Sequence, residues 1–201
     1  MIKALMVDVD GVVIRGRGDG GLWHSSLLAD LGVRYDDLQK KFFAVHWQDV
    51  TTGRADLREC LAPVLATIAP GLAVEELIAY WHANDAAVDR DVLDAVDCAR
   101  QRGLRAALVT NQDHERSRYL WGEVGLGRHF DDMIYSAALG IRKPEPGFYR
   151  AAARRTGFAP REHLLIDDTE ENVWAAKVEH WNAVKWDRQS DLAELLAGEF
   201  L

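Results

Sequence analysis

The sequence predicts an α/β fold: a doubly wound, mostly parallel sheet with an α-helical module inserted after its first strand. Short apolar runs alternate with amphipathic runs of helical period over most of the 201 residues. The alternation is interrupted between residues 22 and 84, where the patterns are helical and no strand candidate stands out. Short apolar runs of this kind suit parallel strands that helices cover on both faces.

The predicted strands are short and mainly aliphatic. Each is followed by polar or turn-forming residues, which is typical of strand ends in α/β proteins. In chain order they are residues 4–9, 105–110, 133–136, 164–167 and 183–186.

Helices are predicted between these strands from apolar periodicity and from their stop signals. The segment 91–102 places Val92, Val96 and Ala99 on one stripe and is followed by Gly103. Segment 146–156 begins with a proline, which the first turn of a helix tolerates. The remaining predicted helices of this part are residues 114–124 and 170–179.

The inserted module is predicted to contain four amphipathic helices, at residues 22–32, 35–50, 54–69 and 73–85. We expect a domain of residues 16–85 within a core formed by residues 1–15 and 86–201. The glycine-rich segment 15–21 is the expected outgoing linker. The module's tryptophans, Trp23, Trp47 and Trp81, each adjoin a histidine. We expect the tryptophans to fill the module's own core, with a substrate-lining role as the alternative.

The composition limits the classes of function. Asp and Glu outnumber Lys and Arg by 32 to 24, for a net charge of −8, which argues against binding to nucleic acid or an anionic membrane. Cys60 and Cys98 lack metal-ligand spacing. We expect two free thiols in a reducing compartment, with one disulfide as the alternative. No apolar run is long enough to span a membrane, and two aspartates interrupt the first one. A cytoplasmic protein is therefore expected.

Polar side chains stand where the predicted strands end. In parallel α/β sheets, ligands bind beyond the carboxyl ends of the strands, so these side chains are expected to converge. They are Asp8 and Asp10 after the first strand, Thr110 and Asn111 at the second, Lys143 beyond the third, and Asp167 and Asp168 at the fourth.

The charges of this group do not balance. Two like charges ~4 Å apart repel by roughly 4 kcal/mol at an effective dielectric constant near 20. Lys143 alone cannot neutralise the four aspartates. Hard carboxylate oxygens suit Mg²⁺, which commonly binds where a few carboxylates meet a substrate phosphate. The sequence therefore predicts Mg²⁺ as the cofactor.

Four motifs carry a resemblance to a known family. "DVDGV", "LVTN", "RKPEPGFY" and "IDDTEENV" occur in this order at predicted strand ends, around the inserted helices. The chain thus resembles the haloacid dehalogenase-like (HAD) superfamily of phosphohydrolases, in the branch with a helical cap after the first motif. The resemblance covers the whole core and implies a Rossmann-like fold; the module matches only in position, size and helical character.

The resemblance implies a role for each matching position. Asp8 is the expected nucleophile, forming an aspartyl-phosphate, and Asp10 the general acid and then base. Gly11 lets the chain turn, so that Asp10 swings beside the leaving group. Thr110 and Asn111 are expected to hydrogen-bond phosphoryl oxygens.

The resemblance also implies the charge partners of the reaction. Lys143 is expected to neutralise Asp8 and the transferring group. Mg²⁺ is expected on the Asp8 carboxylate, the Asp10 backbone carbonyl and Asp168, with Asp167 binding directly or through water.

The sequence thus predicts a Mg²⁺-dependent phosphatase for a small phosphorylated metabolite, with a mobile helical cap. Asp10 favours phosphate esters over the carbon chemistry of the family's dehalogenases. A phosphotransferase or sugar-phosphate mutase, and a catalytically idle binding member, are the alternatives. The substrate's identity and the oligomeric state are left open.

Overall fold

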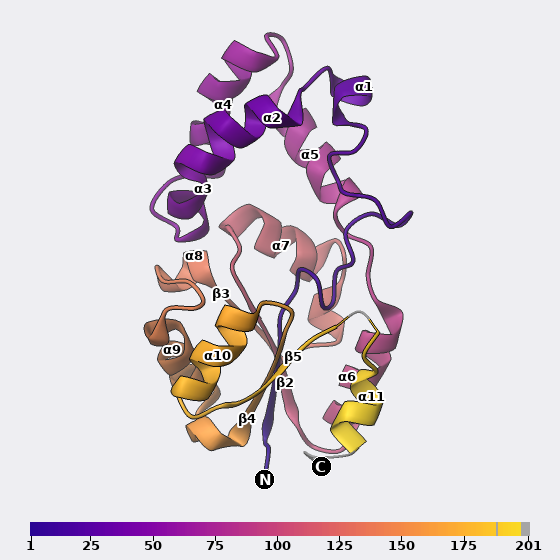
Figure 1. Ribbon diagram of the computed structural model, residues 1–201, viewed down its shortest axis with the longest axis vertical. Helices are drawn as coiled ribbons and strands as arrows, with labels where there is room; N and C mark the ends of the chain where they lie inside the picture. Colours follow the sequence, from indigo (N-terminus) through magenta and orange to yellow (C-terminus); the bar gives the residue numbers. More distant parts are fainter. Residues whose placement is uncertain (188, 198–201) are drawn as a thin grey trace.

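A five-stranded sheet, parallel throughout, forms the centre of the computed structural model, which describes residues 1–187 and 189–197 (Figure 1). The strand order is β3-β2-β1-β4-β5, and Ala4 of the central strand is in register with Arg105 and His163. The predicted α/β class is confirmed. The strands are β1 Ala4–Val7, β2 Arg105–Thr110, β3 Asp132–Tyr135, β4 His163–Asp167 and β5 Asn182–Lys185.

The first strand is two residues shorter than predicted. The Val9 carbonyl accepts hydrogen bonds from the amides of Val12 and Ile14, at 3.3 and 2.8 Å. The chain therefore bends into a turn where its apolar composition suggests further strand. The other strands and the four predicted core helices start and end within two residues of their predicted positions.

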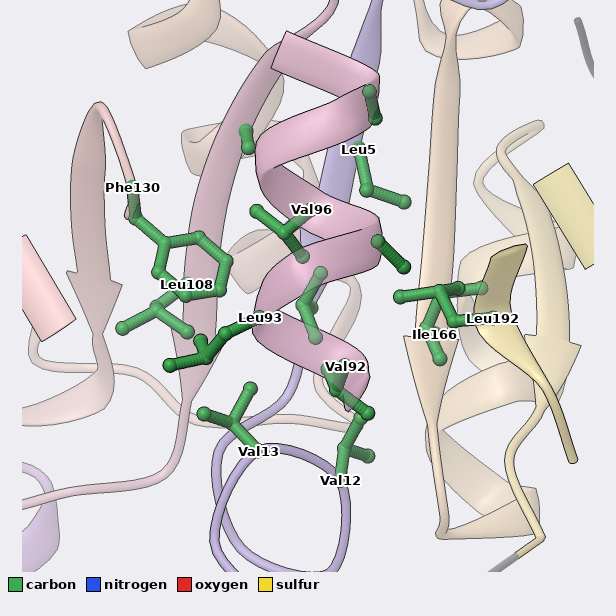
Figure 2. Packing of buried hydrophobic residues seen from close by; sticks show 14 of the residues in the cluster. Leu5, Val12, Val13, Val92, Leu93, Val96, Leu108, Phe130, Ile166 and Leu192 are labelled. Atoms are coloured by element: carbon green, nitrogen blue, oxygen red, sulfur yellow. The ribbon is translucent and has the colours of Figure 1, made fainter. Parts of the chain in front are cut away.

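Helices cover both faces of the sheet because alternate strand residues point to opposite sides. On one face, Leu5 and Val7 pack under α6 (Arg90–Gln101), together with Leu108 and Ile166 (Figure 2). On the other face, α9 (Pro146–Thr156) and α10 (Glu170–Val178) pack against the remaining strand residues. Shorter elements complete this part: α7 His114–Gly122, α8 Ser136–Leu139 and α11 Leu192–Leu195.

The inserted segment, residues 22–84, forms a helical insert beyond the carboxyl edge of the sheet (Figure 1). The helix predicted over 35–50 is one continuous run, with a π-helical turn at Gln39–Phe43 between α2 and α3. The first predicted helix is shorter than expected, since α1 begins only at Leu27 after a series of turns. The helices are α1 Leu27–Leu31, α2 Tyr35–Leu38, α3 Ala44–Thr51, α4 Leu57–Ile68 and α5 Val74–Asn84.

The helical insert has a hydrophobic core of its own, rich in aromatic rings. The Trp81 ring lies 5.2 Å from that of Trp23 and 5.4 Å from that of Trp47, measured between centroids. Trp81 is buried, and the other two pack partly buried against the same cluster. The tryptophans thus fill the insert's interior, as expected.

The helical insert contacts the rest of the chain mainly through α7 and α8. Arg58 of α4 forms an ion pair with Glu115 of α7. At Gly53 the backbone has φ 68° and lies so near α8 that an added Cβ would be 2.4 Å from the Ala137 carbonyl oxygen. The His82 ring of α5 stacks on Tyr119, with 4.8 Å between centroids. These contacts hold the insert against the core.

The two chain segments that lead into and out of the helical insert are paired with each other. The Arg15 amide donates to the Ala87 carbonyl at 2.8 Å, and the Ala87 amide donates to the Gly16 carbonyl at 3.0 Å. Ile14 and Val88 form an antiparallel bridge beside them. The insert is thus joined to the core by a short two-stranded ribbon.

The two cysteines lie in different parts of the molecule, Cys60 in α4 and Cys98 in α6, and both are free thiols. This confirms the expectation of unpaired sulfurs. Of the helices in the described part of the chain, none has the length and apolar character that crossing a membrane requires.

The contact between His82 and α7 makes stability depend on pH. His82 is 5% exposed, and burial, together with the cations of Arg116 and Arg58, lowers its pKa to about 4. The unfolded chain takes up a proton near the usual histidine pKa of roughly 6.5. Stability is therefore lost as pH falls from that value toward 4, by up to about 3 kcal/mol.

We expect His82→Phe, which keeps the stacked ring but cannot titrate, to flatten this part of the stability profile. Urea unfolding of both proteins at intervals between pH 4 and 7 measures the effect. Parallel profiles for the two proteins would contradict it.

Candidate active site

The residues singled out at the strand ends converge on one pocket of about 470 Å³ at the carboxyl edge of the sheet. Asp8, Asp10, Thr110, Lys143 and Asp168 all line it. Asn111 lines it too, whereas Asp167 lies fully buried behind its wall. A hollow of about 510 Å³ beside α10 lacks this chemistry, because its lining is mostly apolar and carries only Glu170 and Glu171 as charged groups.

Asp8 directly follows β1 and is 7% exposed. Its Oδ1 accepts a hydrogen bond from the Val9 amide at 2.7 Å and lies 3.0 Å from Lys143 Nζ. Within the described residues, its Oδ2 accepts no hydrogen bond. Burial raises the pKa of Asp8 to about 8, opposed by Lys143 and supported by the Asp167 and Asp10 carboxylates. One carboxylate oxygen is thus fixed and the other is available.

Of the described residues, Lys143 is the only cation in direct contact with the buried carboxylates of Asp8 and Asp167. Its ammonium group contacts Asp8 Oδ1 at 3.0 Å and donates to Asp167 Oδ2 at 2.6 Å and the Val109 carbonyl at 2.8 Å. Burial by itself lowers the pKa of Lys143, but Asp8 and Asp167 outweigh it and raise the pKa above its usual value. Lys143 therefore stays charged, and all three of its protons have partners.

Asn111 holds the backbone of Lys143. Its Nδ2 donates to the Lys143 carbonyl at 2.9 Å, and its Oδ1 accepts from the Lys143 amide at 2.8 Å. The Asn111 side chain is therefore occupied in positioning Lys143. Thr110 is buried at the end of β2 and lines the pocket.

The two acids after β4 have different surroundings. Asp167 is fully buried, and its carboxylate accepts from Lys143, from the Thr169 amide at 2.9 Å and from Asn172 Nδ2 at 3.0 Å. Asp168 is exposed and, among the residues that the structure describes, accepts only from Thr169 Oγ1, at 3.2 Å. Burial, followed by the neighbouring Asp167, raises the pKa of Asp168. Carboxylate oxygens of Asp8, Asp167 and Asp168 lie within 4.8 Å of one another, so this corner can hold a cation.

Gly11 permits the close approach of Asp168 to the first motif. Its φ is 84°, and an added Cβ would lie 2.0 Å from Asp168 Oδ2. The turn at Gly11 also carries Asp10 out of the sheet, so that the Asp10 side chain is about half exposed, at 51%. The predicted turn at Gly11 is thus present. It leaves room for Asp168 and carries the Asp10 side chain out of the sheet.

Asp10 is held by two side chains that the sequence motifs did not indicate. Gln112 Nε2 donates to its Oδ2, and Arg116 Nη2 donates to its Oδ1 at 3.1 Å. Arg116 is four residues before the buried Leu120, so it lies on the apolar stripe of α7. A charged residue on such a stripe is the sequence signal that could have identified it.

Comparisons with known proteins identify the family of this chain and its fold. The sequence matches the family model of haloacid dehalogenase-like hydrolases over residues 2–178. A phosphoserine phosphatase of Thermus thermophilus is 36% identical over 91 residues, covering 45% of this chain and 36% of the relative. A phosphoglycolate phosphatase of Pseudomonas putida is 26% identical over 183 residues, covering 87% and 65%. The chain spans about a third of the length of the first curated relatives it matches.

The fold recurs in solved structures. A HAD family enzyme of Bacteroides thetaiotaomicron, in complex with magnesium and inorganic phosphate, has a TM-score of 0.76 and 17% identity. The similarity covers 97% of this chain and 99% of that one. At this identity, it is the fold that the two proteins are shown to share.

The role of Lys143 in the site can be tested through stability. Lys143→Met leaves Asp8 and Asp167 buried without a cation, and removing one partner of a buried ion pair typically costs about 3–5 kcal/mol. We expect a loss of this size in urea unfolding at neutral pH. Lys177→Met, the same change at an exposed position of α10, is the matched control. Equal small losses in both variants would show that the charges in the site do not depend on Lys143.

Proposed function

We propose that this chain, which belongs to the haloacid dehalogenase-like hydrolase family, hydrolyses a small phosphate monoester through an aspartyl-phosphate on Asp8. The observation that carries the proposal is the state of the Asp8 carboxylate. One oxygen is fixed by the Val9 amide and Lys143, and the other is available at a pocket that Asp10, Thr110 and Asp168 also line. An oriented carboxylate beside a second acid provides both a nucleophile and a proton donor.

Mg²⁺ is the cofactor we propose, because the donor set fits it. Three carboxylates with oxygens within 4.8 Å of one another share one lysine, which leaves excess negative charge. Carboxylate oxygens are hard ligands of the kind Mg²⁺ prefers. We propose that Asp8, Asp168 and the Asp10 backbone carbonyl hold the ion. The oxygens of Asp167 already accept bonds from Lys143, Thr169 and Asn172. Asp167 would therefore contact the ion through water or hold Lys143 without contacting the ion.

In the first step, the available oxygen of Asp8 attacks phosphorus and the bond from phosphorus to the ester oxygen breaks. Asp10 gives its proton to the departing oxygen. Lys143 keeps the attacking carboxylate oriented, and the Thr110 hydroxyl would donate to a phosphoryl oxygen. A cation held by Asp8, Asp168 and the Asp10 backbone carbonyl would supply positive charge that stabilises the transferring phosphoryl group.

In the second step, Asp10 takes a proton from a water molecule whose oxygen attacks the aspartyl-phosphate. The bond between phosphorus and the Asp8 oxygen breaks, inorganic phosphate leaves, and both carboxyl groups return to their starting states. Asp10 is thus used twice, which supports phosphate esters over carbon–halogen bonds as the substrate. Asn111 contributes by holding the backbone of Lys143.

We propose that residues 16–85 form a cap domain over a catalytic core of residues 1–15 and 86–201. The pocket is also lined by Ile14, Arg15, Gly16 and Asp85 of the connecting segments and by Leu22 at the start of the insert. A cap at this place would exclude water and select the leaving group. A pocket of about 470 Å³ suits a small phosphorylated metabolite. The net charge of −8 and the free thiols are consistent with a cytoplasmic enzyme that binds neither nucleic acid nor membrane.

The proposed activity predicts Mg²⁺-dependent release of inorganic phosphate from an aryl phosphate and from one or more members of a panel of small phosphate esters. EDTA should abolish it, and Asp8→Asn should lower the rate at least about a thousandfold, because the nucleophile is lost. Asp94→Asn, at an exposed position of α6, is the control.

Phosphate release by Asp8→Asn at the wild-type rate would refute the assigned nucleophile. Halide release from a 2-haloacid without phosphate release from any ester would instead assign carbon chemistry. Transfer of phosphate to an added alcohol, with none released to water, would assign a phosphotransferase.

The turn at Gly11 gives a second test. Alanine at a positive φ costs roughly 1–2 kcal/mol, so Gly11→Ala and Gly103→Ala should lose similar stability, since both glycines have left-handed φ, 84° and 94°. Only at Gly11 would the new methyl group displace the Asp168 carboxylate. We expect calorimetric titration to show weaker Mg²⁺ binding in Gly11→Ala alone. Equal Mg²⁺ affinity in both variants would remove Asp168 from the metal site.

A further inference from the structure

We propose that Arg116 is a positioning residue for Asp10, and that it connects Asp10 to the base of the helical insert through Asp85. The inference rests on the proposed function, because it concerns how the acid of that reaction is held. Within the described residues, Arg116 is the one cation that contacts both a catalytic carboxylate and the end of the insert.

The contacts of Arg116 are direct. Its Nη2 donates to Asp10 Oδ1 at 3.1 Å and to the Asp85 carbonyl at 2.8 Å, and lies 3.2 Å from Asp85 Oδ2. Asp85 directly follows α5, the last helix of the insert. A single guanidinium group thus joins the first motif to the insert's return segment.

The placement of Arg116 is fixed from its own helix. Asp113 caps the start of α7, and its Oδ1 accepts from the Glu115 and Arg116 amides at 2.7 and 3.0 Å. The Arg116 side chain is 2% exposed, so it cannot turn away into solvent. A buried guanidinium of this kind requires carboxylate partners, and it has two.

Two polar atoms beside Asp10 have no partner within the described residues. Arg116 Nη1 and Gln112 Oε1 are both buried without a hydrogen bond. Such groups are rare in folded proteins, and each of these two atoms retains the capacity for a further hydrogen bond. Both Asp10 oxygens already accept bonds, from Arg116 and Gln112. A displacement of Asp85 together with the insert would therefore alter the bonds that orient Asp10.

An alternative role for Arg116 is stability alone, as a buried ion pair that supports α7. The two roles differ in their dependence on the leaving group. A positioning residue for the proton donor matters when the departing alkoxide needs a proton, and matters little when the leaving group is a stabilised phenolate. A purely structural residue would affect both kinds of ester equally.

The experiment compares an alkyl phosphate with p-nitrophenyl phosphate as substrates of wild type, Arg116→Met and Asp10→Asn. We expect Arg116→Met to lower kcat/KM, which reports formation of the aspartyl-phosphate and not the hydrolysis step that both esters share, at least about tenfold more for the alkyl ester, in the same direction as Asp10→Asn. Arg116→Lys, which restores a cation without the guanidinium geometry, should recover part of the loss. Arg118→Met, at an exposed position of the same helix, should leave both rates unchanged. Equal losses of kcat/KM for both esters would overturn the positioning role.

A second measurement needs no activity. Melting temperatures of Arg116→Met, Asp85→Asn and the double variant form a cycle, as do those with Asp10→Asn. We expect each double variant to lose less than the sum of its single variants, because the same contact is removed twice. Additive losses in both cycles would show that Arg116 joins neither acid. A wild type without phosphatase activity would overturn the proposed function and the positioning role, while the cycles would still decide the connection to Asp85.

Discussion

The site is organised by the buried ammonium group of Lys143. It lies between Asp8 and Asp167 and donates to the Val109 carbonyl of the neighbouring strand. Each contact comes from a different strand end, so the group fixes β1, β2 and β4 relative to one another at the place where the sheet opens to the pocket. Without it, carboxylates excluded from water would face each other across a few ångströms, an arrangement that costs several kcal/mol.

The contacts of Lys143 also make the three aspartates of the site differ from one another. Lys143 and Asn172 donate hydrogen bonds to the Asp167 carboxylate, so Asp167 is buried and holds Lys143 in place. Asp168, in contrast, is exposed and lines the pocket. Asp8 is held by one oxygen only. Burying these charges in an apolar sheet costs free energy, but the same close packing fixes their orientation. Asp8, Asp167 and Asp168 have the same side chain, but their surroundings give each a different exposure and different partners.

The core and its acidic strand ends could be predicted from sequence because both follow from local patterns. Short apolar runs and runs of helical period locate the elements, and parallel strands place Asp8, Thr110 and Asp168 at one edge. Arg116 and Gln112 could not be placed in this way, because their contacts depend on how α7 packs beside a turn a hundred residues earlier. The pairing of the Asn111 side chain with the Lys143 backbone likewise requires two loops to meet, and no local period encodes that meeting.

The hydrogen bonds that pair the two connecting segments, at Arg15, Gly16 and Ala87, bear on how the helical insert could move. Two independent strands of chain would let a tethered body swing and rotate in many directions. Two strands that are hydrogen-bonded to each other bend far more easily across their plane than within it. The pairing therefore reduces the number of directions in which the helical insert could move relative to the core. Because Asp85 lies two residues before the paired Ala87, the same pairing also limits how far Asp85 could move from Asp10.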